Sequence, residues 1–442
     1  MAIIPQPRLF GWEEIEQLGD LERLRLVLEN LPDEELMRDL ERERKKGRDD
    51  YPVRAVWNSI LAGIVYQHPS IESLRRELRR NAQLRHLCGF DPARGEKAVP
   101  PAWVYSRFLK KLMARQQLLE VIFNRLVEQM SEQLPDFGRI LAIDGKAIAS
   151  FAPGRKRQEG KVVKRDGRRE LDADWGQKTL RGEKEDGSTW EKVVWWFGFK
   201  LHLVVDATYE LPVAFSLTKA SASEVKQAHR LIDQMSEQLP AIIERCEYFL
   251  GDRGYDDGKL HTKLWNGHAI KPVIDIRNMW RDGEETRLIN GFANLVYDYK
   301  GQVYCYCPQT AQRRPMAYGG FEKDRGSLKY RCPARHYGLS CLGMDRCRVK
   351  GAVRIPLKED PRIFTPLARS SYAWKSIYKK RTAVERVNSR LDRVFGFEEH
   401  YIRGLKKMTL RCTLALLVML VMALGRVREK KVQNLRRLVS AA

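Results

Sequence analysis

Three carboxylates stand where an acid could take part in chemistry. Asp144 follows an apolar run in LAIDGKA, and Asp252 follows another in FLGDRGYD. Glu385 is the single acid among six cations between Trp374 and Arg390. Carboxylate oxygens are the ligands that Mg²⁺ and Mn²⁺ prefer, and two such ions support phosphodiester chemistry by acting on the attacking and leaving oxygens. The three acids therefore indicate a two-metal site that acts on a nucleic-acid backbone.

Each acid also has an ordinary structural interpretation. Asp144 could form a turn, Asp252 could cap an element, and Glu385 could be an ion-pair partner. The order of the three acids, their placement at element ends and their basic setting together favour the catalytic interpretation. Asp206 and Glu224 compete for the same role. They rank lower because Asp206 falls in the turn-like DATYE and Glu224 in the first turn of a predicted helix.

A sheet must bring the two aspartates together. Apolar runs predict strands at residues 139–148, 193–206 (interrupted at Gly198), 211–217 and 246–250, with a helix over residues 223–235 before the last strand. Three strands, a helix and another strand are typical of a mixed sheet with helices packed on it. Both aspartates then lie at strand ends, where a sheet displays functional groups without breaking its core.

Glu385 lies in a stretch with helical spacing over residues 371–391. Tyr378, Arg381 and Glu385 stand at i, i+3 and i+7, so they share one helix face, and Asn388 continues it. We therefore expect Glu385 to face the strand ends, with Tyr378 and Arg381 reaching the same site. The surrounding cations would hold a polyanion and reduce the repulsion among the acids.

The charge balance supports a nucleic-acid partner. Lys and Arg total 80 against 57 Asp and Glu, which gives a net charge of +23 over 442 residues. An anionic membrane surface is the second possible partner. The simplest interpretation is a basic protein whose charge serves no polyanionic partner. Residues 150–190 form a polar segment without periodicity, with eight Lys or Arg in residues 155–169. We expect a mobile loop there that contacts phosphate or is simply solvated.

Two other regions frame the predicted sheet. Residues 1–135 have helical spacing at 13–30, 53–66, 71–80 and 102–128, with Ser70 as an N-cap and prolines 100 and 101 starting a second basic helix. These basic helices could enter a DNA groove or be ordinary solvated faces. Residues 414–424 are apolar but too short to span a bilayer, which takes about 20 residues, so we expect a buried helix. With no signal peptide visible, we expect a cytoplasmic protein with reduced cysteines.

Residues 261–369 contain five of the eight cysteines and strand-like pieces such as ANLVYDY and GQVYCY. Cys307, Cys332, Cys341 and Cys347 are candidate Zn²⁺ ligands, with Cys305 and His336 nearby in the sequence. Their spacing lacks the tight CxxC pairs of a strong zinc motif. Buried reduced thiols are the alternative.

Four segments in order resemble the bacterial insertion-sequence transposases of the Asp-Asp-Glu type, which have an RNase H-like core. The segments are LAIDGKAI, GFKLHLVVDATYELPVAFSLTKAS, YFLGDRGYD and YKKRTAVERVNSRL. The last is similar to the Tyr-x2-Arg-x3-Glu helix of one branch. SLRRELRRNAQLRHLCGF and WVYSRFLKKL resemble the helical domain that precedes the core in that branch.

The resemblance implies a multidomain α/β fold whose RNase H-like mixed sheet has flanking helices. Asp144, Asp252 and Glu385 would bind two Mg²⁺ (or Mn²⁺) ions, and Tyr378 and Arg381 would contact a phosphate. The family pattern has Lys seven residues after the Glu, where this chain has Asp392, so Arg390 or Arg393 would supply that charge. The implied domains are a helical DNA-binding domain (1–135), a core in two parts (136–260 and 370–425), an irregular β-containing insertion (261–369) and a basic tail (426–442).

The resemblance further implies a cut-and-paste transposase that binds double-stranded DNA at the terminal inverted repeats. It would hydrolyse phosphodiesters at the element ends and transfer the 3′-hydroxyl strand to target DNA, as a homodimer at the nucleoid and not at a membrane. Trp265 and Trp280 would stack on a displaced base or pack in the insertion. A structure-specific nuclease of the same fold and a non-catalytic DNA-binding protein derived from a transposase are the alternatives.

Overall fold

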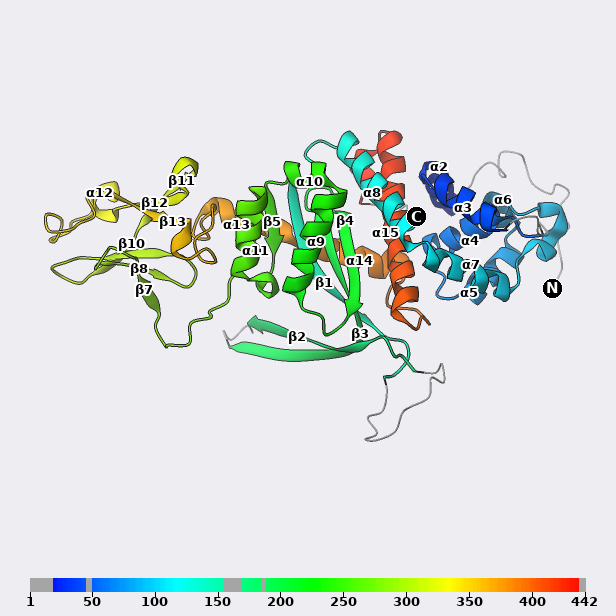
Figure 1. The fold of residues 1–442 in the computed structure, drawn as a ribbon, viewed down its shortest axis with the longest axis horizontal. Helices are drawn as coiled ribbons and strands as arrows, with labels where there is room; N and C mark the ends of the chain where they lie inside the picture. Colours follow the sequence, from blue (N-terminus) through cyan, green and yellow to red (C-terminus); the bar gives the residue numbers. More distant parts are fainter. Residues whose placement is uncertain (1–18, 45–49, 155–168, 184–187, 437–442) are drawn as a thin grey trace, which may run out of the picture. The chain divides into compact units, whose positions relative to one another are not determined.

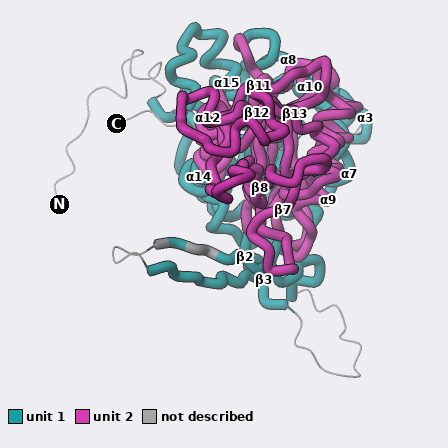
Figure 2. The backbone as a smooth tube through the Cα atoms, turned by 90° about the vertical axis from the view of Figure 1, so that its left-hand side faces the viewer, with its two compact units in different colours: residues 1–133, 148–199, 389–442 teal, residues 134–147, 200–388 magenta. Residues whose placement is uncertain are grey.

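The computed structural model describes residues 19–44, 50–154, 169–183 and 188–436. The chain forms two compact units, each built from segments that are distant in the sequence (Figure 2). The first unit contains residues 1–133, 148–199 and 389–442, and the second contains residues 134–147 and 200–388. Asp144, Asp252 and Glu385 all belong to the second unit.

The second unit is built on a mixed sheet in which neighbouring strands follow the order β4-β3-β1-β5-β6. β1 runs parallel to β5, and β5 runs parallel to β6. This is the multidomain α/β architecture with a mixed sheet that the sequence predicted. The strand bounds are β1 Ile140–Ala149, β3 Thr189–Asp206, β4 Leu211–Lys219, β5 Tyr248–Gly251 and β6 Lys271–Ile274.

Helices pack against this sheet. In Figure 1, α9 and α11 lie in front of the strands, while α13 packs on β6. α9 begins where the Ser223 side chain accepts a hydrogen bond from the Lys226 amide, which satisfies one of the free N–H groups of the first turn. The bounds are α9 Glu224–Gln238, α10 Pro240–Arg245, α11 Gly258–Thr262, α13 Tyr372–Tyr378 and α14 Thr382–Phe395, with a 3₁₀ turn at Lys379–Arg381 between the last two.

Two strand predictions need correction. β3 runs through Gly198 without interruption, because a Cβ there would come within 2.1 Å of the Ile148 carbonyl oxygen, so the glycine allows close strand approach. The segment predicted as a loop contains β2 (Asp174–Glu183), which pairs antiparallel with the first half of β3. Aromatic side chains such as Trp175 and Phe197, with ring centroids 5.6 Å apart, pair across this hairpin. Residues 155–168 lie outside the described part.

The insertion holds two further sheets, and its expected β content is confirmed. One has the order β10-β9-β8-β7, and the other has the order β11-β12-β13. They share one apolar core that includes Leu295, Val303 and Tyr330. The bounds are β7 Thr286–Leu288, β8 Leu295–Asp298, β9 Val303–Tyr306, β10 Arg313–Pro315, β11 Ala317–Glu322, β12 Ser327–Arg331, α12 Pro333–Tyr337 and β13 Ala352–Pro356.

The described residues up to 133 are mostly helical, as predicted, but the helices are more numerous than expected. The segment expected as one helix over residues 102–128 is broken at Arg115, whose guanidinium pairs with Asp39 and Glu43. Ser70 is the N-cap of α5, as predicted, and accepts from the Ser73 amide. The bounds are α2 Glu22–Asn30, α3 Glu34–Arg44, α4 Val53–Val65, α5 Ile71–Arg80, α6 Ala82–Cys88, α7 Ala102–Ala114 and α8 Gln116–Gln133.

The apolar run near the C-terminus forms the middle of α15 (Leu405–Arg428). This described helix is long and apolar enough to cross a membrane by length and composition, but 94% of its most apolar window is buried within the protein. It packs against α2, α4, α7 and α8 of the same unit (Figure 1). The prediction of a buried helix is therefore confirmed.

Candidate active site

The parallel pairing of β1 and β5 sets Asp144 beside Asp252. Ala142 pairs with Leu250, and each aspartate lies two residues further along the chain, Asp144 within β1 and Asp252 just after β5. Neighbouring strands are about 4.8 Å apart, so the two carboxylates emerge on the same face as neighbours. Asp144 is buried, with 8% of its surface exposed. Asp252 follows β5 in extended conformation, and its Oδ1 accepts from the Gly254 amide at 2.7 Å.

Glu224 joins these aspartates from the first turn of α9. Its Oε1 lies 3.1 Å from the Lys200 Nζ on β3. A Cβ at Gly145 would lie 3.0 Å from Glu224 Oε1, and a Cβ at Gly254 would lie 2.5 Å from Glu224 Oε2. The carboxylate is therefore wedged between two glycines, one in each aspartate motif. Sequence reasoning did not place Glu224 beside the two aspartates, and the glycine in each Asp motif was the available signal.

Tyr255 lies within electrostatic range of Asp144, Glu224 and Asp252. Its side chain is fully buried, and within the described residues its hydroxyl has no hydrogen-bond partner. Burial raises its pKa well above the ordinary value, and the negative charges of Glu224, Asp144 and Asp252 raise it further. The three carboxylates therefore act on the same buried hydroxyl.

The fourth acid, Glu385, lies in the first turn of α14. Arg381 binds Glu385, with Nη2 and Oε1 2.7 Å apart, and its guanidinium lies 5.8 Å from the Tyr378 ring centroid. Burial lowers the pKa of Arg381, but the charges of Glu385 and Asp144 help raise it above the ordinary value. Arg381 thus binds Glu385 and lies within electrostatic range of Asp144. We call Asp144, Glu224, Asp252 and Glu385 the acid cluster.

Tyr378 faces the same strand ends, together with an acid that sequence reasoning missed. Ile274 on β6 pairs with Gly251, so Asp275 stands next to Asp252, where it binds Arg253 at 2.5 Å. Burial, and then the charge of Asp275, raise the pKa of Tyr378, and Asp252 adds to the effect. The run KPVID, an apolar strand ending in Asp, was the signal for Asp275.

The Asp206 carboxylate is occupied by backbone amides. Its carboxylate accepts from the amides of Gly138, Thr208 and Tyr209 at 2.6–2.9 Å, and it is fully buried. These bonds hold the turn after β3 and the chain entering β1. Burial raises its pKa to about 6.

Arg390 and Arg393 occupy different sides of α14. At 100° per residue, Arg393 lies about 80° and Arg390 about 140° around the helix axis from Glu385. Arg393 is exposed, while Arg390 is half-buried. Asp392 lies about 20° from Glu385 by the same geometry, so the acid does occupy the place of the expected Lys. Arg393 is therefore the better candidate for the missing charge.

The two tryptophans of the insertion pack on neighbouring rings. Trp265 meets Phe321 edge-on at 5.5 Å, and Trp280 meets Tyr297 edge-on at 5.9 Å between ring centroids. Arg287 lies over Trp280 at 4.6 Å. These contacts favour the packing role over base stacking.

The predicted cysteines converge in the insertion and line one cavity together with Cys305. Hydrogen bonds from Thr310 and the Gln309 amide lower the pKa of the Cys307 thiol to about 6, whereas burial and the neighbouring cysteines raise that of Cys305 to about 11. As the side chains stand, the described part of the chain has no group of three His, Cys, Asp or Glu that could hold a metal ion. His336 does not line the cavity. We call Cys305, Cys307, Cys332, Cys341 and Cys347 the cysteine cluster.

Family comparisons agree with this geometry. Residues 135–421 match the model described as a transposase DDE domain, which covers more than half of the chain and all four members of the acid cluster. Residues 12–111 match a second model, described as a transposase domain (DUF772). No curated protein matches the chain. The chain belongs to the transposase DDE domain family.

Proposed function

We propose that this transposase hydrolyses phosphodiester bonds at the ends of an insertion sequence and transfers the freed 3′-hydroxyl strand to target DNA. The observation that carries the proposal is the register of β1 and β5, which sets Asp144 beside Asp252. Arg381 also supports the proposal, because this cation binds Glu385 and lies within range of the negative charge of Asp144.

The acid cluster suits divalent metal ions of the Mg²⁺ type. Its donors are carboxylate oxygens, and within the described residues the unpartnered Tyr255 hydroxyl is near enough to Asp144, Asp252 and Glu224 for their charges to raise its pKa. Asp144, Asp252 and Glu385 would hold two ions. When bound, the ions would supply charge stabilisation for the attacking and leaving oxygens of the phosphodiester.

The chain's own residues would hold and orient the DNA strand. Arg381 and Tyr378 lie beside the acid cluster and offer a guanidinium and a hydroxyl to a phosphate. Release of Arg381 from Glu385 would free the carboxylate for a metal ion and the guanidinium for the phosphate. Glu224, held by Lys200 at 3.1 Å, would position the Asp144 and Asp252 loops through the two glycines.

The helical domain would recognise the DNA. The match of residues 12–111 to a transposase domain supports a role in binding the terminal inverted repeats. The α5 helix offers the exposed Arg76, Arg79 and Arg80, and the net charge of +23 favours phosphate contact. We further propose a homodimer at the nucleoid, since two element ends need two sites.

The test is Mg²⁺-dependent cleavage of DNA that carries the flanking inverted repeats. Glu385→Gln removes the charge while keeping the shape, so we expect cleavage to fall by about 10³-fold. Glu244→Gln, at an exposed position on α10, is the matched control and should cleave like wild type. Equal cleavage by wild type and Glu385→Gln would remove Glu385 from the mechanism.

A second assay separates the reaction types. A pre-cut element end and a target plasmid are supplied with Mg²⁺. Joined products support transposition, whereas cutting without joining identifies a nuclease. DNA binding that persists without either reaction in the wild type identifies a DNA-binding protein.

A further inference from the structure

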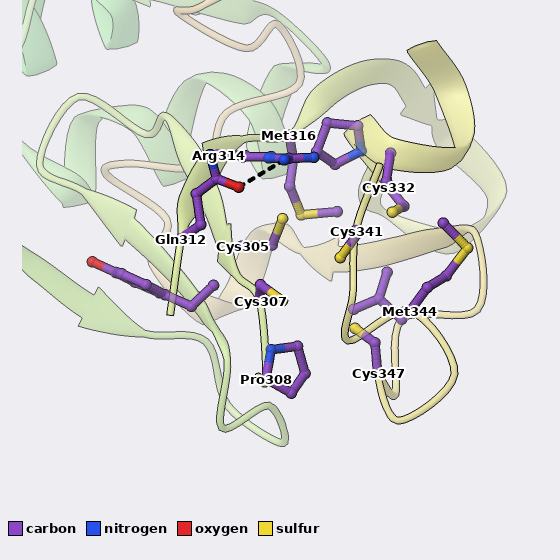
Figure 3. Close-up of a pocket in the computed structure, with 14 residues that line it drawn as sticks. Cys305, Cys307, Pro308, Gln312, Arg314, Met316, Cys332, Cys341, Met344 and Cys347 are labelled. Carbon is purple, nitrogen blue, oxygen red and sulfur yellow. Dashed lines mark hydrogen bonds between the residues drawn. The ribbon is translucent and has the colours of Figure 1, made fainter. Parts of the chain in front are cut away.

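The insertion gathers five thiols from three separate segments. Cys305 lies on β9, Cys307 follows that strand, and Cys332 follows β12 of the other sheet. Cys341 and Cys347 lie in the loop of residues 338–351, which has neither helix nor strand. The cysteine cluster thus stands where both small sheets and an irregular loop meet (Figure 3).

The thiols of this cluster face one another across a small cavity. Figure 3 shows their sulfur atoms turned toward a common centre, and the cavity has a volume of about 30 Å³. Cys307 and Cys341 are within hydrogen-bond reach of each other. A volume of this size suits one ion or one water molecule but no larger ligand.

The loop buries little apolar surface. Leu339 and Leu342 are exposed at 46% and 75%, while Val349 is its buried contribution to the apolar core of the insertion. A loop of this length without regular structure is uncommon in a compact domain unless something fixes it. Cys341 and Cys347 bring it to the two sheets.

The surroundings of the sulfur atoms are those of thiolate ligands. The Cys307 sulfur accepts from the Thr310 hydroxyl and from the amides of Gln309 and Gly343. The Cys347 sulfur receives the Asn294 side-chain amide at 3.4 Å. N–H donors around sulfur orient and tune metal-bound thiolates, whereas thiols that only fill a core do not need them.

We propose that Cys307, Cys332, Cys341 and Cys347 bind one structural Zn²⁺ ion that joins the two small sheets and the loop. Four sulfur ligands with no open position are typical of structural zinc. Zn–S bonds of about 2.3 Å require the sulfur atoms to close on the cavity, and the loop and strand-end positions permit this movement. Cys305 is fixed in the ladder between Leu295 and Arg314 and serves as part of the core. The site is independent of the acid cluster and of the proposed reaction.

The experiment is metal analysis of the full chain purified under reducing conditions. We expect one zinc ion per chain, and Co²⁺ in its place should give the absorption of a tetrahedral thiolate site. Cys332→Ser and Cys341→Ser should each lower the zinc content to near zero. Cys305→Ala and Cys88→Ala, which change buried or core thiols, should keep it.

Limited proteolysis provides a readout that does not require a mutant to fold. Removal of zinc by a chelator from the wild type should expose the loop of residues 338–351 to cleavage, and added Zn²⁺ should restore protection. A wild type without zinc that takes up no Co²⁺ overturns the proposal. Loss of metal in Cys305→Ala, with metal retained in Cys307→Ser, overturns the ligand set.

Discussion

The acid cluster and the cysteine cluster both gather side chains from distant parts of the chain, but different backbones hold them. The register of β1 and β5 aligns Asp144 with Asp252, and Glu224 lies in the first turn of α9, which packs on the same sheet. Cys341 and Cys347 sit in a loop with no register of its own. Regular elements set the backbone positions of a site in advance, whereas a site on a loop depends more on its ligand to bring the side chains together.

This difference predicts that substitutions in the acid cluster and in the cysteine cluster affect different properties of the protein. The acid cluster should control cleavage with little effect on folding. The cysteine cluster should control the stability and metal content of the insertion with little effect on chemistry.

The largest effect should come from Asp252→Asn. The change removes one charge and keeps the size, so cleavage of the inverted-repeat DNA should fall by about 10³-fold or more. Zinc content and thermal unfolding should stay at wild-type values. Cleavage within about tenfold of wild type would break the argument from strand register.

Gly254→Ala should come next, at about 10²-fold in cleavage rate. Its new Cβ would lie 2.5 Å from Glu224 Oε2 and 2.8 Å from Asp252 Oδ1. Combining it with Glu224→Ala, which removes the first clash, should give less loss than the product of the two single effects. If the losses of cleavage rate simply multiply, the clash between the new Cβ and Glu224 does not cause the effect of Gly254→Ala.

Gly343→Ala is the corresponding change in the insertion. Its Cβ would lie 2.8 Å from Pro308 Cδ and 3.0 Å from the Cys307 sulfur. Zinc affinity should fall by about tenfold, as for other changes beside metal ligands, while cleavage changes by less than about threefold. Competition with a chromogenic chelator measures the affinity. Parallel losses of cleavage and zinc would mean that the clusters are not independent.

The smallest effect should come from Arg393→Gln. Loss of one phosphate contact should weaken DNA binding a few-fold and lower the slope of log affinity against log salt by about one. Arg390→Gln, on the other side of α14, is the comparison variant and should leave the slope nearly unchanged. A larger change of the salt slope in Arg390→Gln than in Arg393→Gln would indicate that Arg390, and not Arg393, supplies the charge expected from the Lys.

The sequence predicted the elements of the acid cluster well because strands and helices have periodic patterns. Asp144 and Asp252 were recognisable at the ends of apolar runs. Glu224 and Asp275 have weaker sequence signals, and their closeness to the aspartates follows from helix packing and sheet pairing.

Two strands, β2 and β6, were not predicted from the sequence because their stabilisation comes from neighbouring strands. β2 is polar and rich in glycine, and its pairing depends on Trp190 and Trp196 of β3, which pack over Gly182 and Gly176. β6 falls inside the range expected to be an insertion, but it pairs with β5 of the main sheet. Short strands of this kind are defined by their partners more than by their own composition.

The alignment of Ala142 with Leu250 has a consequence for how this chain tolerates changes in length. The spacing of the two aspartates depends on ladder bonds and not on the number of residues between them, so connecting segments can be shortened or extended in relatives. One added or deleted residue inside either strand, ahead of its aspartate, would instead turn one carboxylate to the opposite side of the sheet. Alignment gaps should therefore cluster outside these two strands.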